Sequence, residues 1–258
     1  MAKPKKKPDY DANKIMKGLL DVVAESYEQT GELKLTAQEF GISALKIRKL
    51  LITAGVYHSE VSDKVNMLYA SGKSLEEIRR ITGLGRSSVN GYLPYTKVIY
   101  NPKEASLNAE RIRMYRRRRR VLADLMDDMT IETLWEAVVA FQGYPFYTAS
   151  RLPFAYELRK GRGAEYNREL IVDRRKEHEH IDWNSFKVAF YYALSLHGKE
   201  VERLEDLGDI PGISYIYPML YRFGIINVPD AVAERNRWPS RFCYFELRSK
   251  GKKKNERA

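Results

Sequence analysis

The sequence predicts a mainly α-helical chain whose first half repeats one helical pattern and whose second half ends in a small α+β domain. Three observations support this fold class. Apolar residues at helical spacing, interrupted by single glycines, run through the first hundred residues; a stretch of good helix formers follows; and apolar and polar residues alternate after Tyr144. With 258 residues, 44% of them hydrophobic, the chain can bury one large core or two modest ones, and we expect two domains.

The formal net charge of +11 is distributed unevenly along the chain. Residues 1–120 hold 24 Lys and Arg against 13 Asp and Glu, whereas residues 121–258 hold 21 of each. The excess of positive charge therefore lies in the first half and favours a polyanionic partner for that half. The lysine- and arginine-rich ends, residues 1–10 and 248–258, are expected to be disordered tails.

Residues 33–55 predict two short helices joined by a tight turn, in "LTAQEFGIS" and "ALKIRKLLITAG". Ala37 lies four residues before Gly41 and lets the second helix pack across the first, while Gly41 accepts the positive φ that the turn needs. Ile47 and Leu50 lie three residues apart and face inward. This spacing is that of a helix-turn-helix.

The outward positions of the second of these helices are those that could meet a major groove and its flanking phosphates. They are Ser43, Ala44, Leu45, Lys46, Arg48 and Lys49. Ser43 can also cap the helix through its hydroxyl. Of this set, we predict that Ser43, Lys46, Arg48 and Lys49 bind DNA.

The stretch "SLEEIRRITGLGRSSVNGYL", residues 74–93, repeats the pattern. Ser74 and Glu77 form a capping box, and Gly83 is the turn glycine. Arg79 stands where a small residue is expected, so either its stem packs flat or the two helices sit slightly apart. The outward positions of the second helix are Arg86, Ser87, Ser88, Asn90 and Gly91.

A long cation next to short hydrogen-bonding side chains suits guanine edges, adenine edges and phosphate oxygens. A plain helical bundle with a solvated basic face would show some of the same features. Two matches in the basic half favour tandem helix-turn-helix units. The segment from about Thr30 to Tyr115 also resembles bacterial helix-turn-helix DNA-binding proteins, of a poorly characterised group carried on mobile elements. The resemblance implies double-stranded DNA as the partner and a regulatory role.

An arginine-rich helix is predicted from Asn108 to Met126. Its five consecutive arginines span more than one helical turn and so cover every face. Such a helix should not be buried, and we expect it to bridge through solvent, to lie along phosphates, or to contact an acidic surface, for which the nearby Asp124, Asp127 and Asp128 are candidates. We predict phosphate contacts from Arg116, Arg117, Arg118, Arg119 and Arg120.

The region from Tyr144 onward predicts a small α+β domain. Antiparallel strands are expected to bring Phe154, Tyr156 and Leu158 opposite residues 169–172, followed by helices in "WNSFKVAFYYALSLHG" and over residues 215–223. The whole chain is therefore divided into residues 1–10 (tail), 11–104 (tandem helix-turn-helix), 105–143 (arginine-rich linker helices), 144–247 (α+β domain) and 248–258 (tail).

Chemistry in the second domain finds little support in the residues. The one histidine cluster, "EHEH" at residues 177–180, is expected to be a solvated polar turn, and Glu165, Glu169 and Asp173 would align on a helix but not on the predicted strand. We therefore expect no catalytic residues, no metal and no cofactor, and we interpret most tyrosines of "FYY" and "YIYPMLY" as core and interface aromatics.

Three functions follow, in order of preference. The first is a sequence-specific double-stranded DNA-binding protein, a transcriptional regulator or accessory protein of a mobile element, whose second domain forms a homodimer or senses a ligand. The second is a recombinase or nuclease subunit with an unrecognised active site. The third is a basic module that binds protein or RNA. No apolar stretch reaches the roughly 20 residues that span a bilayer, so we expect a cytoplasmic, nucleoid-associated protein without membrane contact.

Overall fold

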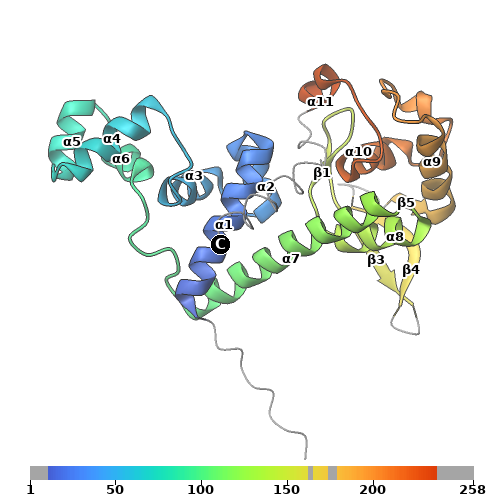
Figure 1. Ribbon diagram of the computed structural model, residues 1–258, viewed down its shortest axis with the longest axis horizontal. Helices are drawn as coiled ribbons and strands as arrows, with labels where there is room; N and C mark the ends of the chain where they lie inside the picture. The colour runs from blue at the N-terminus through green and yellow to red at the C-terminus, as the bar shows by residue number, and fades with distance from the viewer. Residues whose placement is uncertain (1–10, 162–164, 174–178, 237–258) are drawn as a thin grey trace, which may run out of the picture. The chain divides into compact units, whose positions relative to one another are not determined.

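The computed structural model describes residues 11–161, 165–173 and 179–236, and the chain divides into two compact units, Met1–Tyr115 and Arg116–Ala258 (Figure 1). Both expected tails, 1–10 and 248–258, lie outside the described residues. The architecture is mainly helical, with small antiparallel sheets confined to the second unit.

The first core of unit 1 is built by three helices and the start of a fourth. These are α1 (Ala12–Thr30), α2 (Leu33–Phe40), α3 (Ala44–Thr53) and the first half of α7 (Pro102–Asp127). Asp11 caps α1 by accepting from two backbone N–H groups, and Gly31 ends it with φ +64°. Phe40 of α2 stacks on Tyr115 of α7 with ring centroids 5.3 Å apart, so the start of α7 is part of this core.

The second core of unit 1 is small and is formed by α4 (Glu60–Ala70), α5 (Leu75–Thr82) and α6 (Arg86–Tyr92). Its buried side chains are Val65, Ile78, Val89 and Leu93. One or two apolar residues from each helix meet here, because each helix is short and presents a single apolar stripe. The chain then returns from α6 to the first core, where Val98 is buried.

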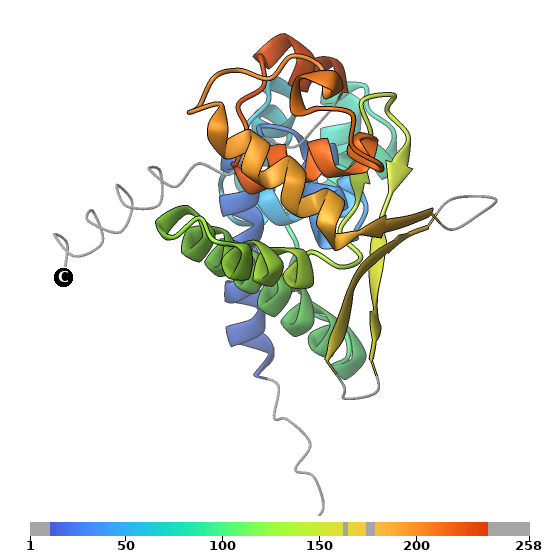
Figure 2. The same ribbon diagram turned by 90° about the vertical axis from the view of Figure 1, so that its right-hand side faces the viewer.

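The described residues of unit 2 form two small antiparallel sheets. One pairs β1 (Phe146–Tyr147) with β2 (Pro153–Phe154), and the other has the order β3–β4–β5, with β3 (Tyr156–Lys160), β4 (Tyr166–Val172) and β5 (Glu179–Asp182). Figure 2 shows β3 and β4 side by side. The predicted register is confirmed where Tyr156 pairs with Val172 and Leu158 with Leu170.

Two details of the predicted strands were wrong. Phe154 pairs with Phe146 in the other sheet and not with β4, because β2 ends at Phe154 and β3 begins only at Tyr156. Glu179 and His180, expected in a polar turn, belong to β5, which is anchored by the buried Ile181 opposite Leu170. His178 lies outside the described residues.

Helices α8 (Ile131–Ala140), α9 (Trp183–Ser195), α10 (Ile213–Phe223) and α11 (Asp230–Asn236) complete unit 2, with a 3₁₀ turn at Leu204–Leu207. Helix α9 packs on β4 and β5, and α10 contacts β1 and α9. Their shared core is rich in aromatic residues, including Phe141, Phe186, Phe190 and Phe223, none of which is exposed.

Helix α7 contributes to the first core of unit 1 and to the core of unit 2. Ile112 and Tyr115 pack in the first core of unit 1, whereas Val121, Leu122 and Leu125 belong to the core of unit 2. The stretch expected to be a separate linker, residues 105–143, is therefore shared between the two units.

Candidate nucleic-acid interface

Helices α5 and α6 are joined by a three-residue turn, Gly83-Leu84-Gly85. The Ser74 hydroxyl accepts from the backbone N–H of Glu77, and the Glu77 carboxylate accepts from the backbone N–H of Ser74, which forms the predicted capping box. Gly83 ends α5 with φ +71°, a conformation that residues with a side chain rarely adopt. Both ends of α5 are thus fixed locally, and α6 starts immediately after it.

Arg79 occupies the position where a small residue was expected. Its guanidinium pairs with Glu76, with Nη1 at 2.8 Å from Oε2, while its Nε atom is buried without a hydrogen-bond partner in the described part of the chain. The Nε atom of Arg79 is therefore shielded from solvent, although the side chain as a whole is 38% exposed.

Helix α6 has one buried face and one polar face. Val89 is buried in the small core. Gly91 was expected on the exposed front, and this was wrong, because Arg48 and Leu45 of α3 lie against it. The four predicted DNA-binding side chains, Arg86, Ser87, Ser88 and Asn90, are exposed. Among the described residues, no hydrogen bond or ion pair engages these four side chains. They offer a cation, two hydroxyls and a carboxamide, which together can donate and accept hydrogen bonds at base edges.

The surroundings of the four predicted residues of α3 differ from those of α6, because three of the four are half-buried and contact other parts of unit 1. Arg48 donates from Nε to the carbonyl oxygen of Gly91 at 3.3 Å, and its guanidinium lies 4.1 Å from the centre of the Tyr92 ring. Lys49 lies over the ring of Tyr95 at 4.6 Å, and burial lowers the pKa of its ammonium group. Both side chains are engaged within unit 1.

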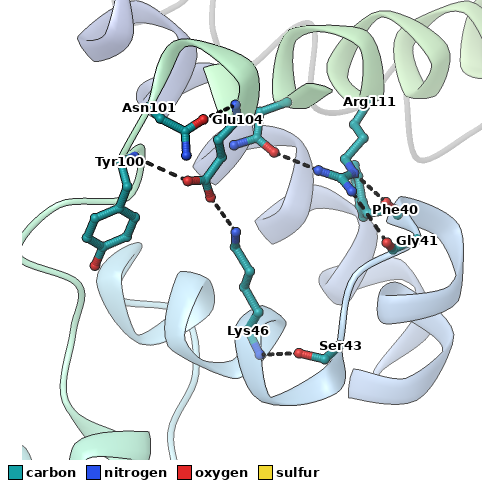
Figure 3. A network of polar contacts seen from close by, with 9 residues as sticks. Phe40, Gly41, Ser43, Lys46, Tyr100, Asn101, Glu104 and Arg111 are labelled. Atoms are coloured by element: carbon teal, nitrogen blue, oxygen red, sulfur yellow. Dashed lines mark hydrogen bonds and ion pairs between the residues drawn. The ribbon is translucent and has the colours of Figure 1, made fainter. Parts of the chain in front are cut away.

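Lys46 is the third of these residues, and it pairs with Glu104 of α7 (Figure 3). Burial alone would raise the pKa of the Glu104 carboxyl, but hydrogen bonds from Lys46 and from the backbone N–H of Tyr100, with the positive charges of Lys46 and Arg111, lower it below its ordinary value. Ser43 accepts from the backbone N–H of Lys46 at 3.3 Å and is the predicted cap.

Arg111 adds a second connection between α7 and the α2–α3 pair (Figure 3). Its Nε donates to the carbonyl oxygen of Phe40 at 2.8 Å, and one of its terminal nitrogens donates to Asn108. The carbonyl of Phe40 is one of the last of α2, so the arginine satisfies a helix end that would otherwise lack a partner. Sequence patterns gave no sign of Arg111 or Glu104, because each acts on a helix more than 50 residues away.

The five arginines of α7 differ in their environments. Arg116, Arg117 and Arg120 are exposed and Arg119 is half-buried, but Arg118 is only 8% exposed. Arg118 donates from Nε to the carbonyl oxygen of Ala140 and lies 4.9 Å from the centre of the Tyr144 ring. The expectation that none of the five would be buried was wrong for Arg118, because aromatic faces and a free helix-end carbonyl can accept a guanidinium.

Several polar and aromatic side chains of unit 2 pair with one another. The described residues contain no group of three or more His, Cys, Asp or Glu side chains that could hold a metal ion. His180 pairs with Glu169 at 2.8 Å across β4 and β5, and Arg168 lies over the rings of Trp135 and Trp183. Tyr215, Tyr217 and Tyr221 are buried, whereas Tyr191 and Tyr192 of α9 are exposed.

Comparison of the chain with protein-family models, with curated proteins and with solved structures finds no match. In the part of the chain that the structure describes, no helix combines the length and the apolar character that crossing a bilayer would require.

Proposed function

We propose that this protein binds double-stranded DNA in a sequence-specific way and acts as a regulatory or accessory factor. In this proposal α2–α3 and α5–α6 are two helix-turn-helix units, and the second unit reads the base sequence through α6. The observation that carries the proposal is the polar face of α6, where Arg86, Ser87, Ser88 and Asn90 are exposed together on a helix that follows the capped α5 after a three-residue turn.

The two helix-turn-helix units have different tasks. Three cations of α3 contact other parts of unit 1, so α3 supports α6 more than it reads bases itself. Arg48 is the direct support, because it joins α3 to the end of α6. In this proposal only α6 reads bases, whereas the sequence had suggested that the outward residues of both α3 and α6 could meet a major groove.

Exposed cations, which we call the basic surface, would attract DNA of any sequence. Arg116, Arg117 and Arg120 are exposed on α7, and the first 120 residues carry the whole positive excess of the chain. Contacts between such cations and phosphates add affinity for any duplex and make binding depend on salt. The base-reading contacts of α6 and the phosphate contacts of α7 should therefore be separable by experiment.

The test is selection of bound duplexes from a random pool at about 150 mM salt, followed by titration of the enriched sequence against a scrambled duplex. We expect an enriched motif that binds at least roughly a thousandfold better than the scrambled duplex. Equal binding to all duplexes would contradict sequence-specific recognition. Tighter binding to single strands or to RNA would instead assign the basic surface to another class of nucleic acid.

A further inference from the structure

Leu45 is an apolar side chain in an unusual place. It is the second residue of α3, follows the capping Ser43 by two positions, and is 55% exposed. Leu45 shares one face of α3 with Arg48 and Lys49, at spacings of three and four residues. Arg48 lies against the ring of Tyr92 and Lys49 against the ring of Tyr95, so the aromatic rings cover this part of the face. Leu45, at the N-terminal end of the same face, remains exposed to solvent.

The open end of that face lies beside α6. A Cβ atom built on Gly91 would lie 3.4 Å from Cδ1 of Leu45, so the leucine is next to the backbone of α6 at Gly91. Ser87 and Ser88 precede Gly91 by four and three residues and therefore lie on the same side of α6. Leu45 thus borders the exposed polar face of α6, although it belongs to another helix.

An exposed leucine at the edge of a base-reading surface has a specific chemical use. In the major groove, the C5-methyl group of thymine is the one apolar feature that a base pair presents, and apolar side chains recognise it. We propose that Leu45 is a specificity-determining residue that contacts a thymine methyl group next to the bases read by α6. This inference rests on the proposed function of α6 and adds a contact from α3 to it.

The experiment removes the methyl group from the DNA and the leucine from the protein in turn. Each thymine of the selected duplex is replaced singly by deoxyuridine, which keeps the hydrogen-bonding pattern and lacks only the methyl group. At one position the wild-type protein should bind about fourfold more weakly, as expected for one buried methyl group. Leu45→Ala should bind the thymine and deoxyuridine duplexes equally at that position.

Two controls keep the result specific. Leu107→Ala changes another exposed leucine, 50% exposed on α7, and should leave the response to deoxyuridine as in the wild type. Circular dichroism should show that Leu45→Ala keeps the helical content of the wild type, because the side chain is mostly in solvent.

The outcomes separate this inference from the proposed function. If the selected duplex binds specifically but no deoxyuridine weakens it, or if Leu45→Ala responds like the wild type at every thymine, then α6 reads DNA and Leu45 does not read a methyl group. If no duplex is enriched, the proposed function and this inference both fail.

Discussion

The guanidinium of Arg48 on α3 donates to the carbonyl oxygen of Gly91 on α6, and the absence of a side chain at Gly91 is what makes room for it. A Cβ atom at Gly91 would lie 2.8 Å from a terminal nitrogen of Arg48, closer than such atoms approach in proteins. The ring of Tyr92 lies beneath the same guanidinium. One arginine thereby connects α3 with α6.

Replacing Arg48 should therefore reduce the stability of unit 1, and should have little effect on contacts with DNA phosphates. We expect Arg48→Ala to destabilise unit 1 by about 1–2 kcal/mol, from one charge-assisted hydrogen bond and one partly exposed cation–π contact. Hydrogen exchange of the α6 backbone amides should speed up. The salt dependence of DNA binding should keep the wild-type slope, whereas removal of a cation that binds a phosphate would lower that slope by about 1.

Arg48→Lys distinguishes the two roles of this residue. Lysine keeps the positive charge but lacks the planar guanidinium that bonds Gly91 and stacks on Tyr92. It should therefore behave like Arg48→Ala in hydrogen exchange. Recovery of full DNA affinity by the lysine variant would assign Arg48 to phosphate binding instead. Lys17→Ala, which removes an exposed cation from α1, is the matched control for loss of one charge.

Base reading by α6 predicts a different signature. Arg86→Ala or Asn90→Ala should cost about 1–3 kcal/mol of binding free energy for the selected duplex and relax the preference at one base pair. Both side chains are exposed, so thermal unfolding should stay close to that of the wild type. Repeating the selection with each variant measures this directly. An unchanged motif would show that α6 does not read those bases.

Much of the fold could be predicted from the sequence because its signals are local. The capping box of Ser74 and Glu77, the turn glycines at Gly41 and Gly83, and the alternation that pairs Tyr156 with Val172 each depend on residues close together in the chain. Such patterns are set by helix and strand periodicity and by turn geometry. The exposed face of α6 followed from the same periodicity.

The errors at the candidate site all concern long-range contacts of cations. Arg48 meets Gly91 across 43 positions, and Lys46 meets Glu104 across 58. Helical periodicity says which side of α3 is polar, but it cannot say whether that side meets water, DNA or another helix. The burial of Arg118 could not be predicted for the same reason. It depends on contacts with Ala140 and Tyr144, which the charge pattern along α7 does not reveal.

The arginine run of α7 should separate into two kinds of residue. Changing Arg116, Arg117 and Arg120 together to glutamine should weaken binding to every duplex about equally and flatten the salt dependence, by up to about 0.9 in slope for each phosphate that is no longer neutralised. The affinity ratio between selected and scrambled duplex should persist. A ratio that disappears with the three arginines would mean that they read sequence and not phosphates.

Arg118→Gln should instead act on the stability of unit 2. Its guanidinium is buried against Phe141 and Tyr144, so we expect a loss of about 2 kcal/mol or more in the free energy of unfolding. Trp135 and Trp183 lie in unit 2, and the sequence has no tryptophan before Trp135, so tryptophan fluorescence during urea unfolding reports on this unit. Arg120→Gln is the matched control, and an equal midpoint for both variants would contradict a structural role for Arg118.

The contact between Lys46 and Glu104 predicts how the stability of unit 1 depends on pH. The pKa of Glu104 is lowered from its ordinary value of 4.5 in the folded chain, so the folded state favours the charged carboxylate. Its contribution is complete above that ordinary value and is lost as the pH falls through the lower folded pKa. Glu104→Gln should therefore be less stable than the wild type at pH 7, and the difference should shrink steadily below about pH 4.5.

Glu110→Gln changes an exposed glutamate of the same helix and serves as the control. Thermal unfolding by circular dichroism between pH 3 and 7 measures the difference, and a gap between wild type and Glu104→Gln that persists at pH 3 would show that shape, and not charge, holds α7 against α3.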